Sequence, residues 1–263
     1  MTAVAGGLDR VVLTGVSKTY DTASGTAVAL SSTDLVIEPG EFVSIVGPSG
    51  CGKTTLLHLL GGFLEPSGGA LRVGADPIAG PGPDRGVVFQ APTLYPWLSV
   101  RGNIEFGPKC RGVERKTRRT ESDRLLRLVG LADSGDKRPY ELSGGMQQRA
   151  QIARVLANDP RIILMDEPFG ALDALTRERL QVELLRLWRE SGKTIVFVTH
   201  SVAEAVFLST RVLVMSARPG RVIVDRRIAL PGDAPDRVRD LAVTATPEFQ
   251  VVKAELAQAI YNA

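Results

Sequence analysis

Five short apolar runs recur along the chain, and stretches of helical period separate them. The runs cover residues 41–46, 86–89, 162–165, 194–198 and 211–214, and each is bounded by turn or helix signals. Buried strands that alternate with helices form a mostly parallel sheet with helices on both faces. The hydrophobic pattern therefore predicts an α/β fold with a mostly parallel sheet core.

The N-terminal part and the middle of the chain follow different patterns. Residues 11–13 and 27–37 hold short apolar runs broken by Gly and Asp, which predict strands of a small antiparallel β layer. Between residues 91 and 160 the period becomes helical, and part of this stretch is rich in arginine. The apolar positions of that part are Leu125, Leu126, Leu128 and Val129. We expect a helical subdomain of about residues 91–160, inserted in a domain of residues 1–230.

Two amphipathic helices are expected in the last third of the chain. The first has apolar positions at i, i+4, i+7 and i+8 and ends at Gly192. These positions are Leu180, Leu184, Leu187 and Trp188. A turn-rich linker at residues 231–236 precedes the helix start Thr246-Pro247-Glu248. The apolar face of this second helix is Phe249, Val252, Leu256 and Ile260, so residues 231–263 are predicted to form a linker and a short helical tail.

One glycine-rich segment lies between the run at 41–46 and a helical stretch that begins at Lys53. The segment is Gly47-Pro48-Ser49-Gly50-Cys51-Gly52-Lys53-Thr54-Thr55. It matches G-x-x-x-x-G-K-S/T, in which glycines let backbone N–H groups wrap around phosphates. Lys53 would supply charge to the β- and γ-phosphates, and the Thr54 hydroxyl can bind Mg²⁺. The alternative, a glycine turn that happens to precede a lysine, does not explain the flanking strand and helix. We therefore expect a nucleoside triphosphate site.

Two adjacent carboxylates, Asp166 and Glu167, follow the apolar run at 162–165. Neighbouring residues on extended backbone point in different directions, so these two carboxylates need not share one ligand. Asp166 can hold Mg²⁺, commonly through water, while Glu167 polarises the attacking water. A kinase would also need an acceptor site, and no motif marks one. The pair favours hydrolysis of the nucleotide.

The segment at residues 142–149, Leu-Ser-Gly-Gly-Met-Gln-Gln-Arg, lies between these two motifs. It offers backbone N–H groups and a serine hydroxyl to an anion, at the start of a helix. Together the three segments resemble ATP-binding cassette (ABC) ATPases, over roughly residues 10–225. The resemblance implies a P-loop cassette in which Ser143, Gly144 and Gly145 of one subunit close over ATP held by another. Because no arginine finger is evident next to the phosphate loop, these donors would stabilise the charge of the transition state. The expected partner is a second copy of the chain, with ATP between the two.

The same resemblance implies four further site residues. Gln90 matches the Q-loop glutamine that senses Mg²⁺ and the attacking water, and His200 matches the switch histidine that contacts the γ-phosphate. Tyr20 matches the aromatic that stacks on adenine. Asp173 ends a segment, residues 169–173, that resembles the D-loop crossing the cassette dimer. A capping histidine and a packed tyrosine are the alternatives for His200 and Tyr20.

The resemblance also narrows the function. The chain lacks the coiled-coil insertion of DNA-repair relatives, the second cassette of translation factors and the fused membrane domain of exporters. Residues 80–86, 169–173 and 94–97 resemble the nitrate/sulfonate/taurine importer group, although Tyr95 replaces an aliphatic residue of the usual Leu-Leu-Pro-Trp. The expected function is the ATPase subunit of an importer for taurine, an alkanesulfonate or nitrate. The implied partners are integral-membrane permease subunits and, indirectly, an extracytoplasmic solute-binding protein.

An alternative from another class is an ABC regulator that acts on nucleic acid or ribosomes. The formal net charge of +3 and pI near 9.0 are only a mild basic excess, and no basic stripe suggests a nucleic-acid partner. No apolar run approaches the roughly 18 residues that span a bilayer, and the first ten residues lack a signal-peptide layout. We expect a peripheral protein at the cytoplasmic face of the membrane. Cys51 and Cys110 lack metal or disulfide spacing, and Cys51 is either a small residue in a tight loop or an oxidation site.

Overall fold

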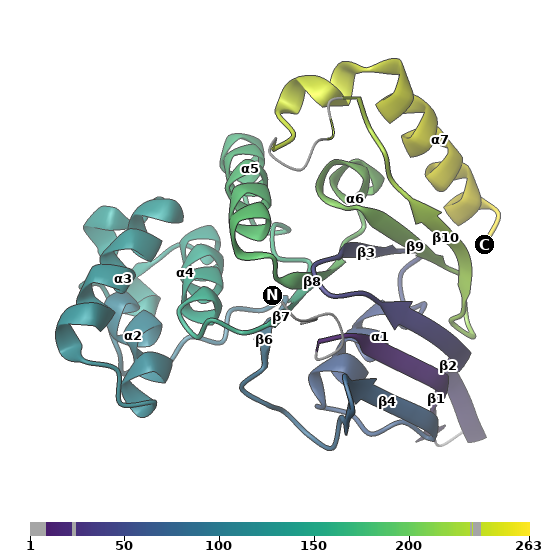
Figure 1. Cartoon of the computed structure of the whole chain (residues 1–263), viewed down its shortest axis with the longest axis horizontal. Helices are drawn as coiled ribbons and strands as arrows, with labels where there is room; N and C mark the ends of the chain where they lie inside the picture. Colours follow the sequence, from purple (N-terminus) through teal and green to yellow (C-terminus); the bar gives the residue numbers. More distant parts are fainter. Residues whose placement is uncertain (1–8, 23–24, 232, 234–237) are drawn as a thin grey trace, which may run out of the picture.

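The computed structural model describes residues 9–22, 25–231, 233 and 238–263, and its centre is a six-stranded sheet in the order β10-β9-β3-β8-β7-β6 (Figure 1). The five strands predicted from apolar runs are present and pair in parallel. They are β3 (Phe42–Val46), β6 (Arg85–Val88), β7 (Ile162–Asp166), β8 (Thr194–Val198) and β9 (Arg211–Met215). The edge strand β10 (Val222–Arg227), which the sequence pattern did not predict, is antiparallel to β9. The expected α/β fold is therefore confirmed.

Alternate residues of the central strands supply two separate hydrophobic cores. Val43 and Ile45 of β3 pack into one core with α1 (Lys53–Gly61), whereas Phe42 and Val46 pack into the other. The second core contains α5 (Ala174–Ser191) and α6 (Val202–Leu208). In Figure 1 these two helices lie above the sheet and α1 lies below it. Because both faces are covered, the central strands carry apolar residues on both faces and do not alternate regularly with polar residues.

The antiparallel layer has the order β2-β1-β4-β5, and it is larger than the sequence pattern predicted. Strands β1 (Val11–Thr22) and β2 (Gly25–Ile37) pair along most of their length. Strands β4 (Gly68–Val73) and β5 (Asp76–Pro77) complete the layer and were not predicted. The outer parts of β1 and β2 are largely exposed, so they carry polar residues that hide the strand pattern. Their pairing places Tyr20 opposite Ala27.

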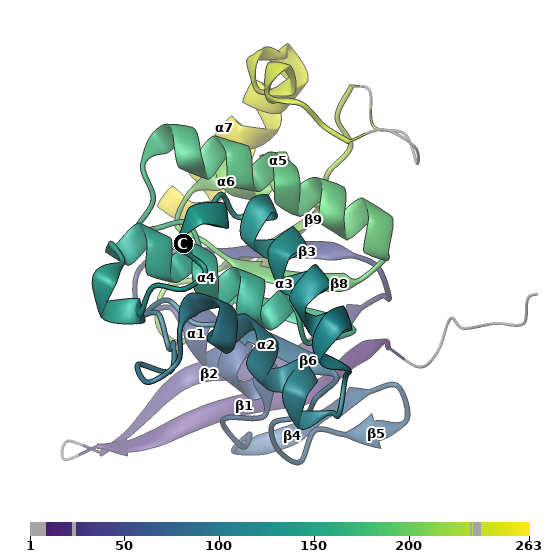
Figure 2. The same ribbon diagram turned by 90° about the vertical axis from the view of Figure 1, so that its left-hand side faces the viewer.

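Three helices and two short 3₁₀ turns lie between β6 and β7. The helices are α2 (Val100–Cys110), α3 (Arg115–Leu128) and α4 (Gly144–Leu156), and the turns are η1 (Ala132–Ser134) and η2 (Pro139–Glu141). Figure 2 shows the three helices together on one side of the molecule. Gln148 and Gln151 of α4 both donate to the carbonyl of Phe89, at 3.1 and 2.7 Å. Helix α4 is thereby tied to the segment that follows β6.

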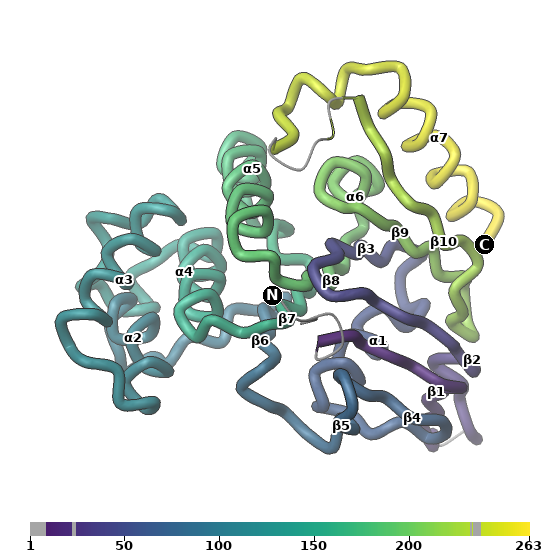
Figure 3. The backbone as a smooth tube through the Cα atoms, viewed as in Figure 1, coloured from purple at the N-terminus to yellow at the C-terminus, as the bar shows by residue number. Residues whose placement is uncertain are grey.

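The C-terminal helix α7 (Pro247–Tyr261) follows a 3₁₀ turn, η3 (Leu241–Ala245), and its backbone returns beside β10 (Figure 3). Thr246 caps it, as predicted, and its apolar face packs into the core around α6. This face consists of Phe249, Val252, Leu256 and the partly buried Ile260. Most of the predicted linker at 231–236 lies outside the described residues. Among the described helices, none is both long and apolar enough to span a membrane.

Candidate nucleotide site

The candidate site lies at the carboxyl edge of four neighbouring strands. The phosphate loop follows β3, His200 follows β8, Glu167 follows β7 and Gln90 follows β6. Since these strands are adjacent in the order β3-β8-β7-β6, the four segments stand in a row. Ligands of open α/β sheets bind at this edge. Residues far apart in the sequence therefore meet at one place because of strand order.

Backbone geometry explains the glycines of the phosphate loop. Gly47, Gly50 and Gly52 have φ of 157°, 73° and 96°, which side chains rarely tolerate. A Cβ on Gly47 would lie 2.6 Å from the carbonyl oxygen of Met215, and one on Gly52 would lie 2.7 Å from that of Ala29. The loop is a tight cradle that opens into helix α1 at Lys53. Such a cradle suits phosphates, because backbone N–H groups and a helix N-terminus face the anion.

Lys53 is 5% exposed and bends back over its own loop. Its Nζ donates to the carbonyls of Gly47 at 2.9 Å and Pro48 at 2.8 Å. It forms no ion pair with a carboxylate of the described residues. The third contact of Nζ is with Cys51 Sγ at 3.7 Å. A buried ammonium held by carbonyls and a sulfur has no anionic partner among the described residues, and this supports the assignment of a phosphate ligand.

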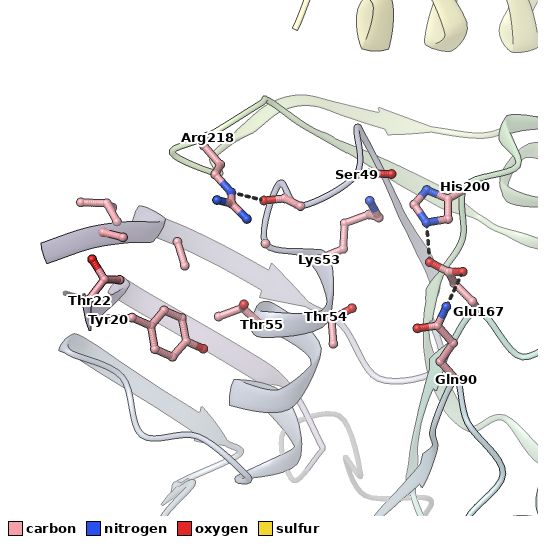
Figure 4. Close-up of a pocket in the computed structure, with 15 residues that line it drawn as sticks. Tyr20, Thr22, Ser49, Lys53, Thr54, Thr55, Gln90, Glu167, His200 and Arg218 are labelled. Carbon is pink, nitrogen blue, oxygen red and sulfur yellow. Dashed lines mark hydrogen bonds and ion pairs between the residues drawn. The ribbon is translucent and has the colours of Figure 1, made fainter. Parts of the chain in front are cut away.

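A cavity of about 470 Å³ connects the phosphate loop to the antiparallel layer (Figure 4). Ten of the predicted site residues line it, together with residues that were not predicted. Its lining is Tyr20, Thr22, Ala27, Val28, Ala29, Ser49, Gly50, Gly52, Lys53, Thr54, Thr55, Gln90, Glu167, His200 and Arg218. Tyr20 is 38% exposed, so its ring is not a packed core residue. The cavity can hold an adenine at the β1–β2 end and phosphates at the loop.

Asp166 and Thr54 form the candidate magnesium position. The Thr54 hydroxyl donates to Asp166 Oδ1 at 3.4 Å, and Asp166 is 3% exposed. Burial raises the pKa of Asp166, and the hydrogen bond from Thr54 opposes that shift. The described residues contain no group of three or more His, Cys, Asp or Glu side chains that could hold a metal. One carboxylate and one hydroxyl nevertheless fit Mg²⁺, since this ion keeps several waters and takes phosphate oxygens as ligands.

Glu167 joins Gln90 and His200. Its Oε1 lies 2.5 Å from His200 Nε2, and its Oε2 accepts a hydrogen bond from Gln90 Nε2 at 3.1 Å. The backbone of Glu167 has φ of 46°, a conformation that costs a non-glycine residue on the order of 1–3 kcal/mol. Asp166 contacts Thr54, whereas Glu167 contacts Gln90 and His200, so the two adjacent carboxylates have different partners. Strain at such a position is typical of functional sites.

Ser143, Gly144, Gly145 and Asp173 do not line this cavity. Ser143 caps α4, its hydroxyl accepting from the Met146 N–H at 3.3 Å, and it is exposed. Asp173 caps α5, and the Thr176 N–H holds the pKa of its carboxyl below the usual value. Both therefore lie at helix N-termini outside the cavity of their own chain. Within one chain, the predicted signature cannot complete the site.

Arg218 is a site residue that the sequence analysis missed. Its Nε donates to the Gly50 carbonyl at 3.0 Å, although 168 positions separate the two residues. The sequence analysis found no arginine finger next to the phosphate loop along the chain, and the structure places Arg218 beside that loop. Arg218 comes from the turn between β9 and β10, and β10 itself was not predicted. Nothing local in the sequence marks this residue, because only strand pairing brings the turn to the loop.

The fold and the cavity define an ATP-hydrolysing P-loop cassette, and comparisons with known proteins agree. The model of the ABC transporter family matches residues 30–170. The taurine import ATP-binding protein TauB of Jannaschia sp. (strain CCS1) is 46% identical over 254 residues, covering 96% of this chain and 94% of that protein. TauB of Ruegeria pomeroyi is 50% identical over 214 residues, covering 81% of this chain and 80% of that protein.

Solved structures of ABC cassettes are also similar to this chain. A dimeric structure of the ATP-binding cassette MJ0796, in a post-hydrolysis state bound to ADP and Pi, has a TM-score of 0.75 and 35% identity. The match covers 83% of this chain and 99% of MJ0796. A second dimeric structure of MJ0796, described as a bacterial ABC transporter cassette, has a TM-score of 0.76. The chain belongs to the ABC transporter family.

Proposed function

We propose that this chain is the ATP-hydrolysing subunit of an importer for a small oxyanion-type solute, namely taurine, an alkanesulfonate or nitrate. The solute would cross the membrane through a separate permease, after delivery by an extracytoplasmic solute-binding protein. The relatives named as taurine import ATP-binding proteins support this assignment. The observation that carries the ATPase part is the Gln90–Glu167–His200 group at the edge of a cavity that contains the phosphate loop.

In this proposal the residues at the phosphate end of the site divide the work of binding and hydrolysis. Lys53 leaves its two backbone carbonyls and neutralises phosphate oxygens, while the phosphate-loop N–H groups hold the rest of the anion. Thr54 and Asp166 hold Mg²⁺, which offsets charge on the phosphates when bound. Glu167 accepts a hydrogen bond from the attacking water and polarises it. Gln90 and His200 orient the Glu167 carboxylate, and His200 contacts the γ-phosphate.

We propose that two copies of the chain complete each other's sites, as the exposed N-terminus of α4 suggests. Ser143, Gly144 and Gly145 of one copy would add N–H and hydroxyl donors to the γ-phosphate held by the other. The dimeric MJ0796 structures support a two-fold assembly of this kind. ATP would hold the two copies together, and its hydrolysis would remove the shared contacts and let them separate.

The permease would bind at an aromatic surface on the segment after Gln90. Trp97 is 68% exposed, which argues against its packing inside the helical region. Tyr95 joins Trp97 and Phe106, with ring centroids 5.4 and 4.8 Å away. A cavity of about 430 Å³ beside Tyr95 and Phe106 also includes Arg154. In this proposal a short helix of a membrane subunit packs against the exposed aromatic rings beside this cavity, and the contact would hold the chain at the cytoplasmic face of the membrane.

The contacts of this segment also connect it to the signature helix. The Thr93 N–H and hydroxyl both donate to Gln151 of α4, at 2.6 and 2.9 Å, and Gln151 donates to Phe89. A displacement of Gln90 at the γ-phosphate would therefore move both the aromatic surface and α4. In this proposal residues 91–160 move as one helical subdomain of an ATPase domain of residues 1–230, and residues 231–263 form the tail.

Transport is tested by reconstituting the tagged subunit with its membrane partners in liposomes. ATPase activity should rise when the solute-binding protein is loaded with taurine, an alkanesulfonate or nitrate, and should not rise with an uncharged sugar. Mass spectrometry of the purified complex should identify integral-membrane subunits. Recovery of rRNA or DNA without such subunits would instead support a regulator acting on ribosomes or nucleic acid.

A further inference from the structure

Arg218 is fixed at the rim of the nucleotide cavity from two sides. On one side its Nε donates to Gly50 of the phosphate loop. On the other, the turn that carries it is tied to β2: the Gly220 N–H donates to Ala29 O at 3.2 Å, and the Ser31 N–H donates to Gly220 O at 2.8 Å. A Cβ on Gly220 would lie 2.0 Å from the Cys51 carbonyl oxygen, so only glycine permits this approach. The turn cannot move away from the loop without breaking these contacts.

The charge of Arg218 has no anionic partner among the described residues. Two other arginines of the β9–β10 hairpin, Arg211 and Arg227, pair with Glu41, and Arg211 also pairs with Asp225. The Nε–H of Arg218 donates to the Gly50 carbonyl, and its two Nη groups form no hydrogen bond within the described part of the chain. Figure 4 shows its guanidinium beside the phosphate loop, on the side of Tyr20 and Thr22.

We propose that Arg218 is a nucleotide-binding residue that pairs with the polyphosphate through its Nη groups. A planar guanidinium with free N–H groups is the side chain best suited to phosphate oxygens. It would supplement Lys53 from outside the phosphate-loop motif, and the cavity would hold cations from two distant parts of the chain. The proposal rests on the assignment of this cavity to the nucleotide.

The test measures equilibrium binding of ADP and of adenosine to the purified subunit by titration calorimetry. ADP carries the phosphates but lacks the γ-phosphate that would join two copies, so its affinity reports contacts within one chain. The variants are Arg218→Ala and Arg218→Lys. Arg221→Ala is the matched control, because it removes the same charge from an exposed residue of the same turn that does not line the cavity.

Arg218→Ala should weaken ADP binding by about 5- to 20-fold, because the exposed guanidinium would lose its charged hydrogen bonds to phosphate oxygens. Arg218→Lys should recover part of the loss, and adenosine should bind each variant equally well. Arg221→Ala should bind ADP like the unmodified chain. The proposal is overturned if Arg218→Ala binds ADP normally, if Arg221→Ala loses as much, or if adenosine binding falls equally. The variant Lys53→Ala tests the assignment of the cavity separately from the role of Arg218. If Lys53→Ala binds ADP as tightly as the unmodified chain, the cavity is not the nucleotide site.

Discussion

The Glu167 carboxylate and the His200 imidazole are joined by a 2.5 Å contact between Oε1 and Nε2. The second carboxylate oxygen is occupied by Gln90, so both oxygens are oriented before any water arrives. A carboxylate held in this way loses little freedom when it binds a water molecule. This geometry is consistent with the general-base role that we propose for Glu167.

Glu167→Gln should keep ATP binding and reduce hydrolysis at least about 100-fold, because the amide keeps the shape but loses the carboxylate that polarises water. An ATP-bound dimer should accumulate, since the γ-phosphate that joins the copies is not removed. Phosphate release and size-exclusion mass are measured on the same sample. Turnover close to that of the unmodified chain would remove Glu167 from this role.

Lys53→Ala and Ser143→Arg should each inactivate a homodimer, the first in the phosphate loop and the second in the site completed on the partner. In a mixed dimer both lesions fall in one composite site, and the other site is intact. Mixing the two variants should therefore restore partial ATPase activity.

The control for this experiment is a mixture of two differently tagged Lys53→Ala preparations, which should stay inactive. Tandem affinity purification establishes that mixed dimers form. If proven mixed dimers remain inactive, then either the two sites act only as a pair or Ser143 does not serve the partner's nucleotide.

Trp97→Ala should leave the basal ATPase of the isolated subunit nearly unchanged and lower solute-stimulated ATPase in the reconstituted transporter. The reason is that Trp97 is exposed and its ring contact is with Tyr95, outside the nucleotide cavity. Tyr261→Ala is a suitable control, because Tyr261 is an 87% exposed aromatic on α7. A transporter that works normally with Trp97→Ala would contradict the docking assignment, as would an isolated variant that unfolds.

Asp166→Asn should raise the thermal stability of the nucleotide-free chain at pH 8. Burial raises the folded-state pKa of Asp166, so the folded chain holds this proton more tightly than the unfolded chain. Ionisation therefore costs stability as the pH rises above about 3.9, the unfolded value. Each kcal/mol recovered by the amide should raise the melting temperature by about 2–4 °C.

This stability gain should shrink as the pH falls toward 4, because the Asp166 carboxyl is then increasingly protonated in both states. Thermal melts at pH 4, 6 and 8 in the absence of Mg²⁺ measure it, and addition of Mg-ATP should stabilise Asp166→Asn less than the unmodified chain. A gain that does not change with pH would show that burial of the charge is not its cause.

The sequence alone determines the phosphate loop, the central strands and the helix caps, because each of these features depends on neighbouring residues. The phosphate loop is nine consecutive residues whose glycines and Lys53 act within one turn, and its identity does not depend on the rest of the fold. The central strands are buried on both faces, so continuous apolar runs mark them. The caps at Thr246 and Gly192 are likewise set by neighbouring residues.

Other features were decided only by the tertiary structure. The half-exposed strands β4 and β10 mix apolar residues with glycine or charged residues, and their place depends on pairing with β1 and β9. The contact between Glu167 and His200 depends on β7 and β8 being neighbours in the sheet. Arg218 reaches Gly50 because pairing of β9 with β3 brings a distant turn to the phosphate loop. No local pattern encodes these approaches, since their physical cause is the burial of whole strands and helices around two shared cores.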